Sequence, residues 1–321
     1  MTEWRPTATR ERLALRAALL AAIRDFFDLR GVLEVDTPWL VNAGVTDVNL
    51  GAVTARLGDH PLYLHTSPEY AMKRLLAAGI GDIYQLCHVA RADEQSRLHN
   101  PEFTLLEWYR CGFSMTALIK ETTLLLDALL LRAGKAPRLL RELRYQQAFI
   151  DALGIDPLVA AHDTLATLAV AQGLAAATAK SLERDGLLDF LISTVIGPTL
   201  GRTEWLALTH YPASQAALAR LDDADPRVAL RFEIYAEGIE LANGFEELAS
   251  AAEQRARFEA DNRLRELRGL PRIDLDERLL AALESGLPAC AGVALGFDRA
   301  VMLASGAASI DEVIAFPTEI A

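Results

Sequence analysis

The feature that most constrains the fold is the stretch from Gln85 to Arg110, in which two strand-like segments flank a polar loop. The segments run from Ile83 to Cys87 and from Glu102 to Tyr109, and both are rich in the branched and aromatic residues that favour strands. The loop between them is built of acidic residues, Ser, Asn and Pro, which favour turns. This pattern predicts a long hairpin.

The hairpin loop carries four polar side chains within ten residues, namely Arg91, Arg97, His99 and Asn100. A guanidinium group can hold a phosphate through two hydrogen bonds at once. With Glu107 and Tyr109 on the second strand, the loop suits an anionic ligand such as a nucleotide. A solvated hairpin tip would have the same composition, and spacing alone favours that interpretation, because charged loops are more common than nucleotide-binding loops.

The composition indicates an ordinary globular protein. The chain has 321 residues, of which 51% are hydrophobic and 24% charged, and a net charge of −12 that disfavours non-specific binding to nucleic acid. Three widely spaced cysteines are interpreted as reduced thiols: Cys87, Cys111 and Cys290. The polar N-terminus lacks an apolar signal core, and no apolar run reaches membrane-spanning length, so we expect a cytoplasmic protein without membrane contact.

A second informative stretch runs from Arg231 to Leu248. Its start has strand character, and a turn at Glu237 and Gly238 would return the chain as a hairpin. Glu233 and Glu240 could then face one site, and two carboxylates with nucleotide phosphates are a common way to hold magnesium. Two outward-facing glutamates on an edge hairpin are the alternative.

A third stretch, from Gly292 to Arg299, reads as a strand that turns at glycine into a helix. The arginine lies in the first helical turn, where helix N-terminal amides and a guanidinium group can both meet a phosphate.

Elsewhere we expect helices at Thr9 to Leu29, Thr116 to Ala133 and Ala251 to Arg268, and a helical insertion at about 148–199 whose His162 is structural. Ser67 precedes another helix as its N-terminal cap.

These stretches resemble the class II aminoacyl-tRNA synthetases, and most closely their lysyl branch. The segments from Val89 to Glu94 and from His99 to Thr104 resemble motif 2, Gly292 to Arg299 resembles motif 3, and a helix, strand and Pro38 resemble the dimer-forming motif 1. Motif 2 usually reads Phe-Arg-x-Glu, whereas this chain has Ala90-Arg91-Ala92-Asp93: the arginine is kept, the aromatic is lost and the acid is shorter.

The resemblance implies an α+β fold, an antiparallel sheet flanked by helices, as a single catalytic domain over residues 1–321 that forms a homodimer. No anticodon-binding OB-fold precedes motif 1, so tRNA is not expected as a partner. Within the lysyl branch, HNPEFTLLEWYR resembles the ligases that attach beta-lysine to elongation factor P. This implies an ATP- and Mg²⁺-dependent ligase that activates (R)-beta-lysine or lysine as an adenylate and transfers it to that protein, releasing AMP and pyrophosphate.

By the same resemblance, Arg91 and Arg299 are the catalytic residues and Glu233 and Glu240 the metal ligands. The implied ATP-binding residues are Arg91, Ala92, Asp93, His99, Asn100, Glu240, Leu241, Gly296 and Arg299. The implied amino-acid-binding residues are Ser67, Pro68, Glu69, Tyr109, Asn243, Glu247 and Ala294. Among these, Glu69 would face a substrate amine, Glu247 a lysine-type ammonium, and Ala294 replaces a glycine of lysyl-tRNA synthetases.

Two other hypotheses stand beside the ligase. The chain could be a truncated lysine-activating synthetase. The missing OB domain and Ala294 distinguish the ligase hypothesis from this one. It could also be a non-catalytic synthetase-like regulatory module, which the altered motif 2 favours and the retained arginines and glutamates disfavour.

Overall fold

The computed structural model describes residues 4–92 and 94–321. The chain divides into two compact units, each described here by itself. Unit 1 comprises Met1–Phe113, Leu124–Pro137 and Leu248–Ala321, and unit 2 comprises Ser114–Thr123 and Arg138–Glu247. Helix α3 (Met115–Arg132) contributes residues to both. Whether the chain is a single catalytic domain stays a prediction.

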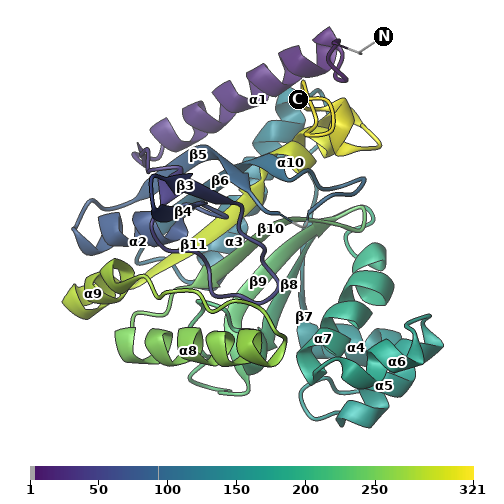
Figure 1. Ribbon diagram of the computed structural model, residues 1–321. Coiled ribbons are helices and arrows are strands. Elements are labelled where there is room, and N and C mark those ends of the chain that lie inside the picture. Colours follow the sequence, from purple (N-terminus) through teal and green to yellow (C-terminus); the bar gives the residue numbers. More distant parts are fainter. Residues whose placement is uncertain (1–3, 93) are drawn as a thin grey trace. The chain divides into compact units, whose positions relative to one another are not determined.

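Unit 1 contains four sheet strands in the order β1 (Leu33–Glu34), β5 (Ile83–Ala90), β6 (Glu102–Cys111) and β11 (Cys290–Gly296) (Figure 1). The predicted hairpin is confirmed, because β5 and β6 pair antiparallel along their length. β6 also pairs antiparallel with β11, whereas β1 and β5 run parallel. A small antiparallel sheet is made by β2 (Leu40–Val41), β4 (His60–Leu64) and β3 (Thr54–Leu57).

The helices of unit 1 are α1 (Arg10–Asp28), α2 (Glu69–Ala77), α8 (Ala251–Leu267), α9 (Glu277–Gly286) and α10 (Phe297–Ser305), followed by the short η4 (Ile310–Glu312). Thr9 caps α1, accepting a hydrogen bond from the Arg12 amide. The start of the chain lies beside its end, since the Thr7 amide donates to the Ala315 carbonyl 3.0 Å away (Figure 1).

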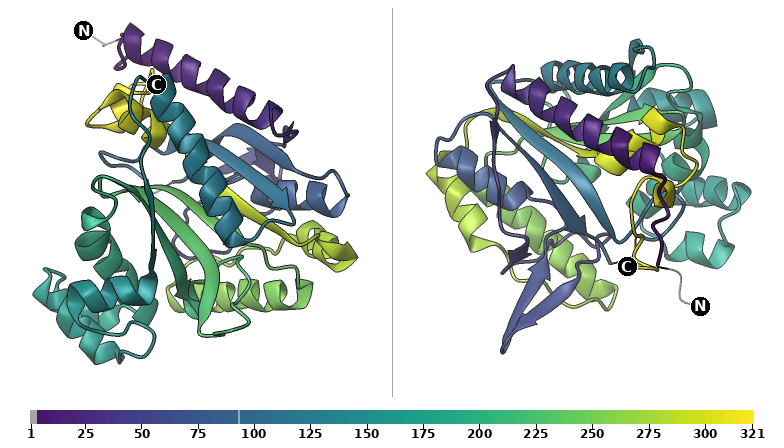
Figure 2. Two further views of the ribbon diagram at one scale, coloured as in Figure 1. Left: turned by 180° about the vertical axis from the view of Figure 1, so that it is seen from behind. Right: turned by 90° about the horizontal axis from the view of Figure 1, so that it is seen from above.

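The two faces of the β5–β6 hairpin have different neighbours. On one face, Phe27 of α1 stacks on Tyr84 with ring centroids 4.4 Å apart and meets Trp108 edge-on, so α1 covers this face (Figure 2). On the other face, Ile83 and Tyr109 join a buried cluster with apolar side chains of α2, α8 and α9. Successive strand residues alternate between faces, so Gln85 and Glu107 lie on this second face.

Unit 2 contains the strand order β10 (Ile239–Glu246), β9 (Val228–Ala236), β8 (Trp205–Pro212) and β7 (Leu140–Arg144). The first three pair antiparallel, and β7 runs parallel to β8. The segment predicted to be helical is helical, with α4 (Tyr145–Leu153), α5 (His162–Ala171), α6 (Ala176–Ser181), α7 (Arg184–Leu191), η1 (Ile192–Ile196) and η2 (Gly197–Thr199); η3 (Ala213–Gln215) follows β8. These helices share a buried cluster with β8, which includes Leu206 and Leu208.

The β9–β10 hairpin turns where predicted, at Glu237 and Gly238. Both residues have positive φ, 53° and 75°, which suits a tight two-residue hairpin turn. A Cβ at Gly238 would lie 2.7 Å from the Pro198 carbonyl oxygen, so this turn requires glycine.

Each unit thus combines a mostly antiparallel sheet with flanking helices, which confirms the predicted α+β class. The two parallel pairs were not predicted. No helix among the described residues is long and apolar enough to cross a membrane.

Candidate active site

The hairpin loop of unit 1 places Arg91 directly after β5. Its Nε donates to the Thr66 carbonyl oxygen at 3.3 Å, its NH1 donates to Glu94 Oε1 at 3.0 Å, and its guanidinium lies 5.1 Å from the Phe103 ring centroid. These contacts come from three directions and fix the guanidinium plane. Glu94 was not among the predicted site residues. Asp93, the predicted acid of motif 2, lies outside the described residues.

The second predicted arginine, Arg299, joins the same cluster from the first turn of α10. Its NH2 lies 2.5 Å from His99 Nε2, and its Nε donates to the Leu98 carbonyl oxygen at 3.3 Å. Burial, and then the charge of Arg299, lower the pKa of His99. The neutral imidazole can therefore accept from Arg299 while its Nδ1 bonds to the Ser96 hydroxyl at 2.7 Å.

Three other residues with predicted ATP contacts have structural partners. Asn100 is buried; its Nδ2 donates to the Glu102 carbonyl at 2.6 Å and its Oδ1 accepts from the Thr318 amide at 3.1 Å. The Ala92 amide donates to the Gly51 carbonyl at 2.8 Å. Gly296 is the N-cap residue of α10. Their contacts with ATP stay predictions.

The predicted amino-acid residues of unit 1 gather around Glu107, which was noted on the second strand but was not among the predicted amino-acid-binding residues. Its side chain is 3% exposed; Oε2 accepts from the Ser67 hydroxyl at 2.7 Å and Oε1 from the Tyr109 hydroxyl at 2.6 Å. Ser67 also accepts from the Glu69 amide at 3.0 Å, but Pro68 rather than Ser67 stands at the N-cap position of α2, so the predicted cap lies one residue too early. One hydroxyl therefore connects Glu69 with Glu107.

Strand register puts Ala294 in the same row of side chains. Glu107 pairs with Gln85 on one side and with Ala294 on the other, and residues directly opposite share a face. The Ala294 methyl group thus stands beside the buried carboxylate, where glycine would leave space.

The ionisation of Glu107 differs from that of an ordinary glutamate. Burial, followed by the charge of Glu69, raises the pKa of Glu107 to about 7, and the Tyr109 and Ser67 hydrogen bonds oppose that rise. A carboxyl group of this kind can take or release a proton near neutral pH when a cation enters.

In unit 2, a bulge brings Glu233, Glu240 and Asn243 onto one face of the β9–β10 hairpin. Glu240 pairs with Tyr235, Asn243 pairs with Glu233, and the register shifts by one residue at Leu241. Tyr235 and Glu233 share a face because they are two residues apart in β9. Glu233 and Glu240 therefore lie on one side of the hairpin, and their sharing of one metal site stays a prediction.

Glu233 is 6% exposed and takes three donors. The Arg231 NH2 group lies 2.6 Å from Oε1, the Tyr235 hydroxyl 2.7 Å from Oε2, and Asn243 Nδ2 3.4 Å from Oε1. Arg231 stacks over Tyr211 at 4.4 Å. Burial alone would lower the pKa of Arg231, but the Glu233 carboxylate raises it, so the arginine keeps its charge.

The remaining predicted residues of unit 2 lie along β10. Leu241 and Glu247 are both buried. Leu241 lies at the bulge, and Glu247 follows the strand and forms an isolated antiparallel β-bridge with Ala219. The described residues contain no group of three or more His, Cys, Asp or Glu that could hold a metal. A cation here would depend on Glu233, Glu240 and ligand oxygens.

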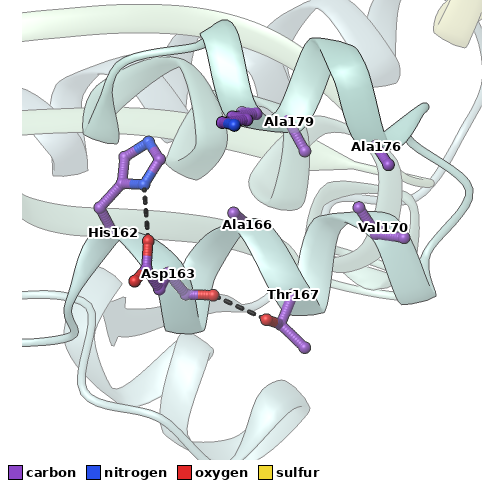
Figure 3. A pocket seen from close by; sticks show the side chains of 8 residues that line it. His162, Asp163, Ala166, Thr167, Val170, Ala176 and Ala179 are labelled. Atoms are coloured by element: carbon purple, nitrogen blue, oxygen red, sulfur yellow. Dashed lines mark hydrogen bonds and ion pairs between the residues drawn. The ribbon is translucent and has the colours of Figure 1, made fainter.

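A surface hollow in unit 2 contains none of the predicted site residues. Figure 3 shows it between α5 and α6, lined by Ala166, Val170, Ala176 and other side chains of these helices. His162 lies at its edge. Its Nε2 atom lies 2.8 Å from the Leu182 carbonyl oxygen, which fits its expected structural role.

The sequence profile of the class II tRNA synthetases (D, K and N) matches residues 1–320. The chain belongs to this family. Its close relatives include proteins named elongation factor P–(R)-beta-lysine ligase. The protein of Vibrio cholerae serotype O1 is 50% identical over 322 residues, 98% of this chain and 98% of its own length. The protein of Avibacterium paragallinarum is 48% identical over 323 residues, 99% of this chain and 98% of its own.

Proposed function

We propose that this chain is an ATP-dependent ligase that activates (R)-beta-lysine and transfers it to a lysine side chain of elongation factor P. The observation that carries the proposal is near full-length identity of 48–50% to ligases of that name. Each alignment covers at least 98% of this chain and 98% of the relative.

In the first step, the amino-acid carboxylate attacks the α-phosphate of ATP, and pyrophosphate leaves from an aminoacyl-adenylate. Arg91 would neutralise charge on the α-phosphate, and Arg299 would hold the γ-phosphate. Both guanidinium groups belong to one side-chain cluster of unit 1, with the neutral His99 beside Arg299. Positioning and charge stabilisation supply the catalysis, and no covalent enzyme intermediate is required.

A lysine-type substrate brings two ammonium groups. In unit 1, Glu69 would meet an amine, with Tyr109 and Ala294 shaping the amino-acid side. In unit 2, the buried Glu247 would meet an ammonium and Asn243 a carboxylate. Glu107 extends this set, because it is a buried acid within hydrogen-bonding distance of Ser67 and Tyr109. Buried acids are what a desolvated ammonium requires.

Magnesium fits the face of β9 and β10 on which Glu233 and Glu240 lie. The Asn243 Oδ1 atom on the same face is buried and accepts no hydrogen bond from the described residues, so an oxygen is available there for a cation or a donor. The ion, once bound, would neutralise phosphate charge. Arg231 would keep Glu233 ionised and oriented.

In the second step, a lysine amine of elongation factor P attacks the activated carbonyl, and AMP leaves. We place this reaction in the cytoplasm and in a homodimer, with no tRNA partner and no membrane.

The test is ATP-dependent transfer of radiolabelled beta-lysine and lysine to purified elongation factor P and, in parallel, to bulk tRNA. We expect label on the protein, more with beta-lysine, and a loss of at least about a hundredfold in Arg299→Ala, since an arginine at a transferring phosphate contributes several kcal/mol. Arg272→Ala, an exposed arginine paired with Glu266, is the matched control and should retain activity.

Label on tRNA alone would instead favour the truncated lysine-activating synthetase. Absence of label on either acceptor, together with absence of pyrophosphate exchange, would favour a non-catalytic regulatory module.

A further inference from the structure

Unit 1 contains a buried lysine that the proposed chemistry does not use. Lys73 of α2 is 1% exposed, and its Nζ lies 2.7 Å from Glu69 Oε1, one helical turn earlier. Surface pairs at this spacing contribute little, but a buried ammonium is strongly unfavourable unless an acid compensates it. The position of Lys73 is therefore tied to the charge of Glu69.

The Lys73–Glu69 pair is connected to Glu107 through Ser67. The Ser67 hydroxyl accepts from the Glu69 amide at 3.0 Å and donates to Glu107 Oε2 at 2.7 Å. The other Glu107 oxygen accepts from Tyr109. The Ser67 and Tyr109 hydroxyls that donate to Glu107 are neutral, and the Lys73 ammonium, the cation of this cluster, is paired with the neighbouring Glu69.

The charges of the cluster can be followed group by group. α2 supplies Glu69 and Lys73, β6 supplies Tyr109, and β5 supplies Cys87, which is a neutral thiol because burial raises its pKa to about 12. β11 supplies only Ala294 beside Glu107. The nearby acids associated with α8 and α9, Asp261 and Asp276, act on Tyr70.

Two ionised glutamates with one lysine leave one negative charge for a ligand to neutralise. Without the lysine, two buried carboxylates would repel each other and one of them would take up a proton. The charge of Glu69 raises the pKa of Glu107, and the charge of Lys73 lowers it.

We propose that Lys73 is a positioning residue, an internal counter-ion that fixes Glu69 and allows Glu69 and Glu107 to be ionised together, so that the pocket accepts a single substrate ammonium. This inference rests on the proposed function and deepens it. It names the amino-acid side of unit 1 as a site for one amine of a diamino acid.

The experiment is the pH dependence of ATP–pyrophosphate exchange with beta-lysine in four proteins: the wild type, Lys73→Met, Glu69→Gln and the double variant. In Lys73→Met we expect the acid limb of kcat/KM for the amino acid to move about one pH unit higher, giving about a fivefold loss at pH 7 that approaches tenfold at lower pH. KM for ATP should not change. The double variant removes one positive and one negative charge near Glu107, so their effects cancel and the acid limb should return toward its wild-type pH.

Lys135→Met is the matched control. Lys135 is a partly buried lysine of unit 1 whose ammonium donates to the Leu303 carbonyl oxygen. It should lower thermal stability without moving the acid limb. A Lys73→Met limb that coincides with the wild-type limb would overturn the proposal and leave Lys73 a purely structural residue, as would a double variant whose limb stays displaced upward.

A second readout separates this inference from the proposed function. Absence of exchange in the wild type would reject the proposed function, and the free energy of unfolding as a function of pH would then test Lys73. Lys73→Met should raise the pKa of Glu107 further. The free energy of unfolding should therefore keep falling with rising pH up to a higher pH than in the wild type. Identical pH dependences would overturn the inference. If Lys73→Met alone does not fold, the double variant, which removes both members of the Lys73–Glu69 pair, provides the comparison with Glu69→Gln. Equal limbs in these two proteins would overturn the inference.

Discussion

Glu107 in unit 1 and Glu233 in unit 2 have the same local arrangement. Each is a buried glutamate on a central strand, and each accepts a hydrogen bond from a tyrosine hydroxyl two residues later, at 2.6 Å from Tyr109 and 2.7 Å from Tyr235. The period of two puts acid and phenol on the same face. The strand thus provides the same Glu-x-Tyr pair twice.

The two glutamates differ in where their cation lies. Arg231 contacts Glu233 directly at 2.6 Å, whereas the lysine of the Glu107 cluster is paired with the neighbouring Glu69. Burial, followed by the charge of Glu69, raises the pKa of Glu107 to about 7. The comparison teaches that a direct guanidinium partner compensates one buried acid, whereas a buried acid surrounded by hydroxyls and another acid is responsive to a ligand.

The largest effect should come from removing the cation of unit 2. Arg231→Met leaves Glu233 buried without its guanidinium, and loss of one partner of a buried pair destabilises by about 3–5 kcal/mol. Urea unfolding followed by Trp205 fluorescence measures the loss. Arg231→Lys keeps the charge and should lose less. A loss below about 1 kcal/mol for Arg231→Met would mean that Glu233 does not depend on this arginine.

A smaller effect should distinguish Glu107 through pH. Its folded pKa of about 7 exceeds the value of 4.5 for an ordinary glutamate, so the folded state binds more protons between these pH values. The corresponding stability is complete below about pH 4.5 and is lost as pH rises through 7, by roughly 2–3 kcal/mol. Glu107→Gln should remove this slope from the unfolding free energy measured at pH 5 to 8. A slope that persists in the variant would assign it to other groups.

The smallest effects should come from the two phenols. Tyr109→Phe removes one of two hydroxyl donors to Glu107 and should destabilise by about 1–2 kcal/mol at pH 8, where Glu107 is ionised. Tyr235→Phe should destabilise less, because Glu233 keeps Arg231. Thermal melts of both variants at pH 8 compare them directly, and equal losses would contradict the distinction between the two acids.

The hairpins of both units were predictable because their strands have clear boundaries and turn residues. The direction of pairing for β1 and β7 was not, since the side-chain period of two is the same in parallel and antiparallel strands. Helix α9 was also missed, although Asp276 caps it and Leu279, Leu280 and Leu283 are buried at helical spacing.

Within the site, sequence motifs located the two arginines, and the structure brings both to His99 and Glu94. They did not indicate Glu94, because a charged loop contains several acids and spacing cannot say which one turns toward Arg91. Lys73 was missed for a related reason: on a helix, one buried lysine among apolar neighbours has no distinctive pattern. The signal that the sequence did offer was the i, i+4 spacing of Glu69 and Lys73, which places the two side chains one helical turn apart.

The bulge at Leu241 makes a spacing, rather than a residue, the feature to search for in distant relatives. Glu240 and Asn243 are three apart, an interval that would send them to opposite faces of a regular strand. A chain that kept this interval but lost the bulge could still pair its strands, yet it would aim one of the two side chains away from Glu233. A one-residue deletion between them would leave an interval of two, which keeps both side chains on one face of a regular strand.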